Sequence, residues 1–397
     1  MTTLDDGAGF TLVELLLSVL IALMVMGAAT AVMDPAQRLF RSQVEAPDLQ
    51  QRVRVGVDAL QKDLLMAGAG SYAGPATGAL HFFLAPLRPY RAFGDGADPA
   101  RGIYFRPDAI SFLYVPSTPS QTSLRAPLEP GALDVQLEAP PNCPPEAAQQ
   151  VCGFEAGDRL LLYDEAGSGD VFRVDQVIGG AALVQHRGEP VVARYEAGAF
   201  VSEVRLGTYY FKVDTAAGTS QLMRHDGWAS DLPVVDEVVG LEFRYFGDAA
   251  PPQLTGMPLD STPGPWTTYG PAPPLIALSR GFWPPGENCT FRVVGGVHLP
   301  RLATIAPGGS AQVELTSKML TDGPWCPDQL SPGRFDADLL RVRRVRVSLR
   351  VQSALASLRG PAGILFSRGG TARAGDRYLP DLAVQFDVTP RNMNLDR

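Results

Sequence analysis

A single carboxylate, Glu14, lies inside the longest apolar run of the chain. The run extends from Phe10 to Met33 and contains no other charged residue. As a helix rising ~1.5 Å per residue it would be ~36 Å long, enough to cross the ~30 Å hydrocarbon core of a bilayer. A carboxylate in such a helix is costly, so two interpretations arise. Glu14 reaches the headgroup region from the helix start, or it forms an ion pair with a specific partner.

The four cysteines are the next residues that could carry chemistry. They show neither C-x-x-C spacing nor an adjacent histidine, so we expect no zinc site. An even number of cysteines outside the cytoplasm is typical of disulfides, and reduced buried thiols are the alternative. Three pairings are possible. We predict Cys143–Cys152 and Cys289–Cys326 because these partners are closest in sequence.

The histidines, at positions 81, 186, 225 and 298, are scattered along the chain. No metalloprotease, serine-hydrolase, Walker or dinucleotide motif accompanies them. His225 and Asp226 follow Ser220 closely, but a catalytic triad is defined by geometry and not by nearness in sequence. The sequence therefore identifies no catalytic residue, metal ligand or cofactor site, and we expect a protein that is not an enzyme.

The residues around Glu14 form a recognisable pattern. Gly9-Phe10-Thr11-Leu12-Val13-Glu14, followed by the apolar run, resembles the cleavage and methylation motif of type IV prepilins. The resemblance implies that prepilin peptidase cleaves between Gly9 and Phe10 and methylates the new amino group of Phe10. It also implies that Glu14 pairs with this amine in a neighbouring subunit. The partners would then be other pilins or pseudopilins, prepilin peptidase and the bacterial inner membrane.

Other segments extend this resemblance toward PilW-like minor pilins and the J-type pseudopilins of type II secretion. They are Gln50–Arg54, Asp63–Gly68, Thr208–Phe211, Gln221–Arg224, Val238–Tyr245 and Leu340–Val347. The implied fold is α+β, with a long N-terminal helix packed on an antiparallel, sheet-rich domain. The implied location is a single-pass inner-membrane protein whose C-terminal domain lies outside the cytoplasm, and later a pilus or pseudopilus.

The first nine residues differ from a typical prepilin leader. They contain no Lys or Arg and carry Asp5 and Asp6, whereas Arg38 and Arg41 follow the apolar run. The positive-inside rule therefore does not favour a cytoplasmic N-terminus. A misplaced start codon would account for the difference. So would an orientation set by the large C-terminal region, because long domains translocate largely regardless of charge.

The chain divides into four parts. Residues 1–9 form the leader, 10–33 the membrane and assembly helix, 34–70 its amphipathic continuation, and 71–397 the sheet-rich domain. The continuation has an apolar stripe at Leu49, Val53, Val57, Leu60 and Leu64. We expect Pro35 and Pro47 to kink or interrupt this helix, and Gly68 and Gly70 to end it.

Beyond residue 75 the pattern predicts strands and turns. Alternation of apolar and polar residues favours antiparallel sheets with one buried face. The predicted strands are 110–115, 159–163, 171–178, 181–185, 208–213, 221–224, 239–245, 339–351 and 382–388. Residues 249–287 hold ten prolines, which block helix and central strand alike, so we predict a Pro-rich insertion within the domain.

Arg344, Arg346 and Arg350 share one face of the predicted strand 339–351. This row is either a surface for acidic partners or DNA, or a solvated sheet face paired with local carboxylates. The net charge of −8 favours the second interpretation and argues against a nucleic-acid partner.

Two functions remain after these exclusions. The first is a structural subunit, a minor pilin or pseudopilin, that assembles into or primes a type IV pilus or a type II secretion pseudopilus. The second is a membrane-anchored extracytoplasmic enzyme or receptor that uses the helix only as an anchor. The motif around Glu14 favours the first, for which no small-molecule substrate is expected. The sequence does not choose between pilus, secretion and DNA-uptake machines.

Overall fold

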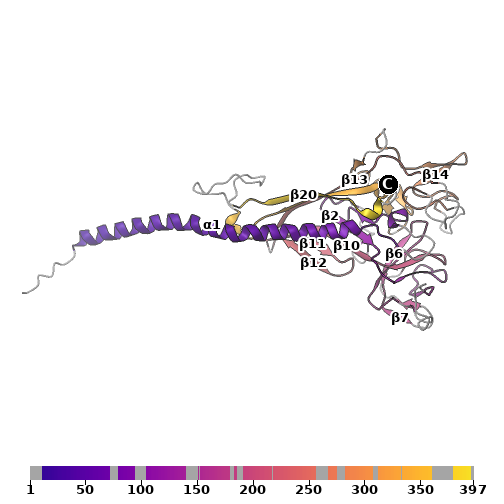
Figure 1. Ribbon diagram of the computed structural model, residues 1–397, viewed down its shortest axis with the longest axis horizontal. Coiled ribbons are helices and arrows are strands. Elements are labelled where there is room, and N and C mark those ends of the chain that lie inside the picture. The colour runs from indigo at the N-terminus through magenta and orange to yellow at the C-terminus, as the bar shows by residue number, and fades with distance from the viewer. Residues whose placement is uncertain are drawn as a thin grey trace, which may run out of the picture. The chain divides into compact units, whose positions relative to one another are not determined.

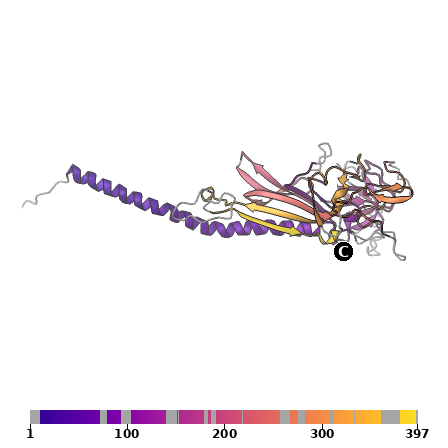
Figure 2. The same ribbon diagram turned by 90° about the horizontal axis from the view of Figure 1, so that it is seen from above.

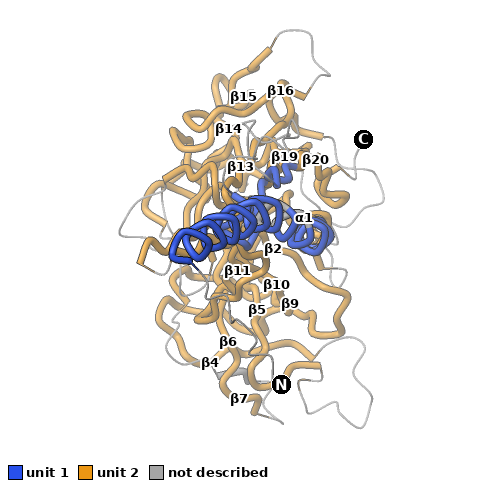
Figure 3. The backbone as a smooth tube through the Cα atoms, turned by 90° about the vertical axis from the view of Figure 1, so that its left-hand side faces the viewer, with its two compact units in different colours: residues 1–53, 350–383 blue, residues 54–349, 384–397 orange. Residues whose placement is uncertain are grey.

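The computed structural model describes most of the chain, and its helices and strands are shown in Figure 1. The described residues are 11–71, 79–93, 104–139, 151, 153–178, 183–185, 191–216, 218–255, 267–274, 282–306, 312–331, 333–359 and 379–394. They fall into two compact units, coloured in Figure 3. Unit 1 contains residues 1–53 and 350–383, and unit 2 contains residues 54–349 and 384–397.

One long helix, α1 (Leu12–Met66), begins the described chain. It runs without interruption through Pro35 and Pro47, so the expected interruption at these prolines is wrong, and a kink at either stays a prediction. Pro47 removes one hydrogen bond to the carbonyl of Gln43, and both residues are exposed, so water can satisfy that carbonyl. The helix ends where expected. Gly68 has a φ of +82°, the left-handed conformation that follows many helices.

The expected apolar stripe on α1 is largely confirmed. Leu49, Val53, Leu60 and Leu64 are buried, and Val57 is half-buried. The prediction succeeds because a spacing of three and four residues places these side chains on one face of a helix.

Within unit 1, a polar network joins α1 to the segment after residue 350. Glu45 Oε1 accepts hydrogen bonds from the Arg52 guanidinium and from the backbone N–H of Ala354, both at 2.5 Å. Arg52 also donates to the carbonyl of Gln352 and to Asp48. The nearly buried carboxylate of Glu45 is therefore compensated by a cation and a backbone donor, as a buried charge requires.

The first large sheet in unit 2 has five antiparallel strands in the order β1-β2-β10-β11-β12. Figure 2 shows the sheets from above. Tyr209 of β10 stands opposite Arg224 of β11, which places both side chains on the same face. The strands are β1 (Leu87–Arg88), β2 (Ala109–Tyr114), β10 (Arg205–Asp214), β11 (Thr219–His225) and β12 (Asp231–Asp236).

Residues 54–66 of α1 pack closely on this sheet and on its neighbour. A Cβ atom at Gly56 would lie 2.9 Å from a methyl group of Val235 and 3.0 Å from one of Leu349. Only glycine permits this approach of the helix backbone to β12 and β19. The same part of the helix contributes the fully buried side chains of Leu60 and Leu64.

A second sheet has the order β16-β13-β19-β20. Its strands are β13 (Val238–Asp248), β16 (Gln312–Leu315), β19 (Val342–Val351) and β20 (Leu382–Val388). The strand predicted at 339–351 begins later than expected, because residues 337–341 form a 3₁₀ helix, η4 (Ala337–Arg341). Asp336 caps η4 by accepting the backbone N–H of Asp338, which favours a helical turn there over an extended strand.

The arginine row of β19 is a solvated sheet face, as the charge balance suggested. Arg344 and Arg346 both bind Asp387 of β20, at 2.8 Å. Arg343 points the other way, is buried, and binds Asp248 at 3.0 Å. The half-buried Arg344, Arg346 and Arg350 thus have local carboxylate partners, Asp387 for the first two and Asp381 for the third.

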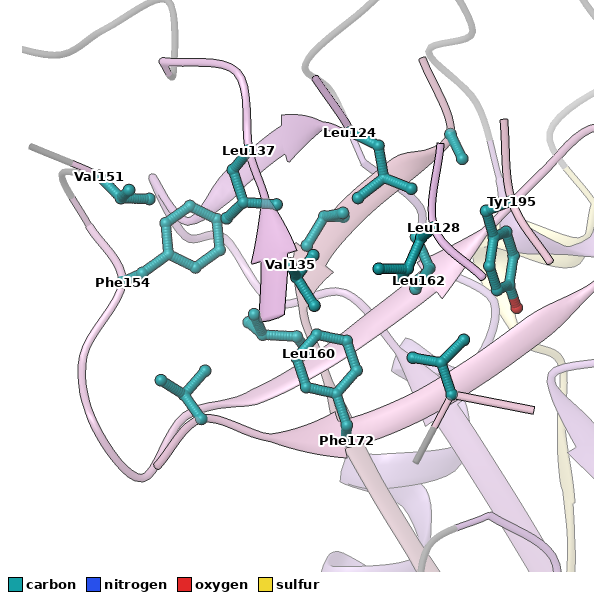
Figure 4. Packing of buried hydrophobic residues seen from close by; sticks show 14 residues of the cluster. Leu124, Leu128, Val135, Leu137, Val151, Phe154, Leu160, Leu162, Phe172 and Tyr195 are labelled. Atoms are coloured by element: carbon teal, nitrogen blue, oxygen red, sulfur yellow. The ribbon is translucent and has the colours of Figure 1, made fainter. Parts of the chain in front are cut away.

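A smaller body of unit 2 has its own core, drawn in Figure 4. Leu160, Leu162 and Phe172 are among its buried side chains. Two sheets contribute, ordered β3-β9-β5-β6 and β4-β8-β7. Their strands are β3 (Gln121–Ser123), β4 (Asp134–Gln136), β5 (Arg159–Tyr163), β6 (Gly169–Arg173), β7 (Gln176–Ile178), β8 (Leu183–Gln185) and β9 (Phe200–Glu203).

The strand expected at 171–178 is therefore two strands. β6 pairs with β5 whereas β7 pairs with β8, so the chain passes from one sheet to the other between them. β7 and β8 pair antiparallel, with Ile178 opposite Leu183.

Short elements complete the described chain. They are the hairpin of β14 (Phe291–Val294) and β15 (Val297–Pro300), the pair β17 (Trp325–Cys326) and β18 (Phe335–Asp336), and the 3₁₀ helices η1 (Leu80–Phe82), η5 (Ala356–Leu358) and η6 (Arg391–Met393). Of the expected Pro-rich insertion, residues 256–266 and 275–281 lie outside the described part, so the insertion stays a prediction. The antiparallel sheets and few helices are compatible with an α+β fold.

Candidate functional site

Glu14 lies in the first turn of α1 and closes a capping box with Thr11. The backbone N–H and the hydroxyl of Thr11 donate to Glu14 Oε2 at 3.0 and 2.9 Å. The N–H of Glu14 points back to Thr11 Oγ1 at 3.3 Å. This reciprocal pair satisfies donors that a helix start leaves without partners. Neither bond from Thr11 uses Glu14 Oε1.

The sequence contained the signal for this cap, which our prediction missed. Thr followed three residues later by Glu, before an apolar run, is the signature of a capping box. Glu14 therefore has a local role that does not need a second subunit. An assembly role of Glu14 has to be tested separately from the cap.

The helix after Glu14 is apolar and uncovered within the described residues. The segment Leu12–Met33 is long and apolar enough to cross a membrane, and none of it is buried. A single-pass anchor and a signal sequence both have this property. The two predicted processing residues, Gly9 and Phe10, lie outside the described residues.

One predicted disulfide is present. Cys289 and Cys326 are bonded, with their Cα atoms 5.1 Å apart, and both are fully buried. The bond links the segment before β14 to β17. The other predicted pair, Cys143 and Cys152, lies outside the described residues.

The base of the β14–β15 hairpin is tied down beside this disulfide. Asn288 Oδ1 accepts the backbone N–H groups of Thr290 and Phe291 at 2.9 and 2.8 Å. Arg301 donates to the Asn288 carbonyl, pairs with Glu287, and lies over the ring of Trp283. The disulfide therefore belongs to a structural cluster.

A polar cluster joins α1 to the five-stranded sheet. Asp63 Oδ2 accepts a hydrogen bond from the Tyr209 hydroxyl at 2.8 Å and from Arg224 Nε at 2.9 Å. Burial and the neighbouring Asp63 carboxylate raise the pKa of Tyr209, so Tyr209 remains a donor. The sequence pattern did not identify Asp63 as a contact residue, because its partners lie about 150 residues away.

A groove next to this cluster is one place where an enzyme or receptor site could lie. Its volume is about 360 Å³, and its lining includes Asp158, Arg159, Glu203, Arg205, Arg224 and Asp226. Arg159 binds Asp226 at 2.9 Å, and Arg205 lies 3.9 Å from Glu203. Each arginine of the groove therefore has a carboxylate neighbour in the protein, and the set is close to neutral.

The possible triad around Ser220 is not assembled. The ring of His225 accepts the N–H of Gly227 through Nδ1. Asp226 accepts the N–H groups of Trp228 and Ser230 and pairs with Arg159. Both groups thus serve the turn that follows β11.

Within the described ranges, no group of three or more His, Cys, Asp or Glu side chains is placed to hold a metal ion. In comparisons with known proteins, no family model matches the sequence, and no curated protein matches it. The N-terminal motif and the geometry around it are therefore the observations on which a function can be proposed.

Proposed function

We propose that this protein is a minor pilin or pseudopilin, a structural subunit that is processed by prepilin peptidase and assembles through its N-terminal helix. The observation that carries the proposal is the hexapeptide Gly9–Glu14 at the start of the apolar run Phe10–Met33. An ordinary anchor has no need of this order of residues. The sheet-rich domain would then lie outside the cytoplasm, where a disulfide such as Cys289–Cys326 is stable.

The physical basis is the cost of a charge in an apolar surrounding. Moving the exposed apolar helix from lipid to a bundle of similar helices exchanges one apolar surrounding for another. Such an exchange gives little preference for any one axial position of the helix relative to its neighbours in the bundle. Glu14 is the only charge in the segment and would be most stable beside a cation. The protonated amine of a neighbouring Phe10 would supply that cation and set the register.

The first experiment is mass spectrometry of the amino terminus of the native protein purified from membranes. We expect a terminal peptide that begins at Phe10 and carries one added methyl group. A Gly9→Val variant should keep the full leader. A native terminus at Met1 or Thr2 would refute prepilin processing and would favour the membrane-anchored enzyme or receptor.

The second experiment separates the charge of Glu14 from its cap. Glu14→Gln keeps the oxygen that accepts from Thr11 but removes the charge, because Gln also completes a capping box. Thr11→Val keeps the charge but removes the hydroxyl, at about 1 kcal/mol of helix stability. The readout is the fraction of processed protein that sediments with sheared filaments or crosslinks to other subunits with the same motif.

The two variants should differ strongly if Glu14 sets the register. We expect Glu14→Gln to lower the assembled fraction at least ~10-fold, because loss of a buried ion pair costs several kcal/mol. Thr11→Val should assemble almost normally. Normal assembly of Glu14→Gln would limit Glu14 to helix capping and would contradict the proposed register role.

A further inference from the structure

A cavity of about 170 Å³ lies in unit 2, where the start of the Pro-rich segment meets the end of the chain. Its lining includes His81, Asp248, Tyr269, Arg343, Met393 and Asn394. Asp248 and Arg343 form an ion pair of 3.0 Å whose side chains are only 6% and 3% exposed. The cavity therefore holds a buried cation that is already paired, next to a buried histidine.

His81 is the unusual member of this group. It is 2% exposed, and its Nδ1 has no hydrogen-bond partner in the described part of the chain. Burial, and secondarily the charge of Arg343, lower the pKa of His81 to about 3, against a hydrogen bond with the backbone of Asn392. The ring stays neutral because Asp248, the carboxylate that lines the cavity, is already paired with Arg343 and cannot also compensate a positive charge on His81.

The last described residues form a clasp next to His81, which we define as Pro390–Asn394. Asn394 Nδ2 donates to the carbonyls of Arg343 and Pro390 at 3.1 and 2.8 Å. Met393 is buried, and a Cβ atom at Gly68 would lie 2.9 Å from its side chain. The clasp therefore connects β19 with the turn that ends α1.

Charged and titratable groups reach His81 from each neighbouring element. β19 supplies Arg343, β13 supplies Asp248, and the Pro-rich segment supplies Tyr269. The clasp supplies the neutral Asn392 and Asn394, and its cation Arg391 is exposed to solvent. Because Asp248 is already bound by Arg343, a proton on His81 would add an uncompensated charge to the cavity.

We propose that His81 is a proton-sensitive latch, which holds the clasp closed while its ring is neutral and releases the clasp when its ring is protonated. Opening lets water reach the imidazole, and an imidazole in water has a pKa of about 6.5. With a pKa of about 3 in the closed state, acidification from pH 7.5 to 5 multiplies the opening constant by about 30. This latch is independent of the proposed assembly function.

The test is amide hydrogen exchange of the full-length protein in detergent micelles at pH 7.5 and 5. The reporters are the clasp amides and the N–H of Gly270, which donates to the carbonyl of His81. After correction for intrinsic exchange rates, we expect their protection factors to fall about 30-fold at pH 5. Protection that changes by less than about threefold would overturn the proposal.

Two replacements and one control make the result specific. His81→Phe and His81→Gln carry no titratable ring, so clasp protection should not depend on pH in either variant. His298→Gln removes a histidine of β15 and should behave as the native protein. A persisting pH dependence in both His81 variants would assign the effect to another group.

A measurement on the native protein covers the case in which both His81 variants open the clasp at every pH. The imidazole carbon signals of His81 can be followed by NMR between pH 8 and 4. A midpoint below about 5 supports the latch. A midpoint between 6 and 7 would show a solvated ring and would refute the proposal.

Discussion

The contact between α1 and the five-stranded sheet gives the sharpest stability prediction. Asp63 is 7% exposed and is the shared acceptor for Tyr209 and Arg224. Asp63→Asn retains the shape of the side chain and removes its charge. Both hydrogen bonds end on Oδ2, so an amide oxygen in that position can still accept them, but it carries no negative charge.

The cost can be worked out from the two bonds and from the exposure of the arginine. A hydrogen bond to a charged group contributes about 1.5–3 kcal/mol, against about 1 kcal/mol for a neutral one. Loss of one member of a fully buried ion pair costs about 3–5 kcal/mol. The Arg224 side chain is 28% exposed, so water partly replaces the lost charge. We therefore expect Asp63→Asn to lower the free energy of unfolding by about 2–3 kcal/mol.

The matched control is Asp58→Asn, because Asp58 lies on the exposed side of the same helix. The full-length proteins are unfolded with urea in micelles. The urea concentrations at the unfolding midpoints are compared between variants whose free energy of unfolding has the same slope against urea concentration. Tyr209→Phe should cost about 1.5–3 kcal/mol, as expected for loss of a hydrogen bond to a charged group. If Asp63→Asn and Asp58→Asn differ by less than about 0.5 kcal/mol, the cluster does not hold the helix to the sheet.

Three further predictions concern other points of unit 2. Gly56→Leu should lower the free energy of unfolding by about 1–3 kcal/mol, because the larger side chain overpacks the contact with the sheets. Val55→Leu, at a 45% exposed position, should leave the free energy of unfolding nearly unchanged in the same urea titration. Replacing Cys289 and Cys326 by Ser removes a crosslink between residues 37 positions apart and should cost about 3–4 kcal/mol. Adding reductant should then lower the thermal midpoint of the native protein more than that of the variant. Burial raises the pKa of Asp336 from 3.8 to about 7, so the folded state binds the extra proton between these values, and stability should fall as pH rises from about 4 to 7. Asp336→Asn should abolish that part of the slope, and an unchanged slope in pH-dependent urea titrations would contradict the assignment.

The helix and its buried face could be predicted from the sequence because their signals are local. Leu49, Val53, Val57, Leu60 and Leu64 repeat every three to four residues, and Gly68 follows as a terminator. Strand pairs with short connections, such as β10 with β11 and β7 with β8, could also be predicted, since alternation and turn residues lie within one window.

Contacts that depend on distant partners could not be predicted in this way. Arg343 and Arg344 are neighbours in sequence, yet one is buried with Asp248 and the other is on the solvent face with Asp387. Their roles depend on which strands flank β19, and that arrangement is not encoded within the segment. The 3₁₀ helix η4 was missed for a different, local reason, because its Asp336 cap competes with an extended pattern that looks continuous.

In the N-terminal segment the local structure is known, but the axial position of the helix depends on a partner. Its apolar side chains, from Leu12 to Met33, are exposed in the isolated chain, and lipid or other helices would cover them about equally well. Apolar packing alone would therefore allow many axial positions. Glu14 changes this, because its carboxylate gains strongly only where a cation lies within a few ångströms. The capping box supplies hydrogen bonds but no positive charge, so the local partner Thr11 does not remove the need for one. Under the proposed function, that remaining need would give the assembled helix a single register.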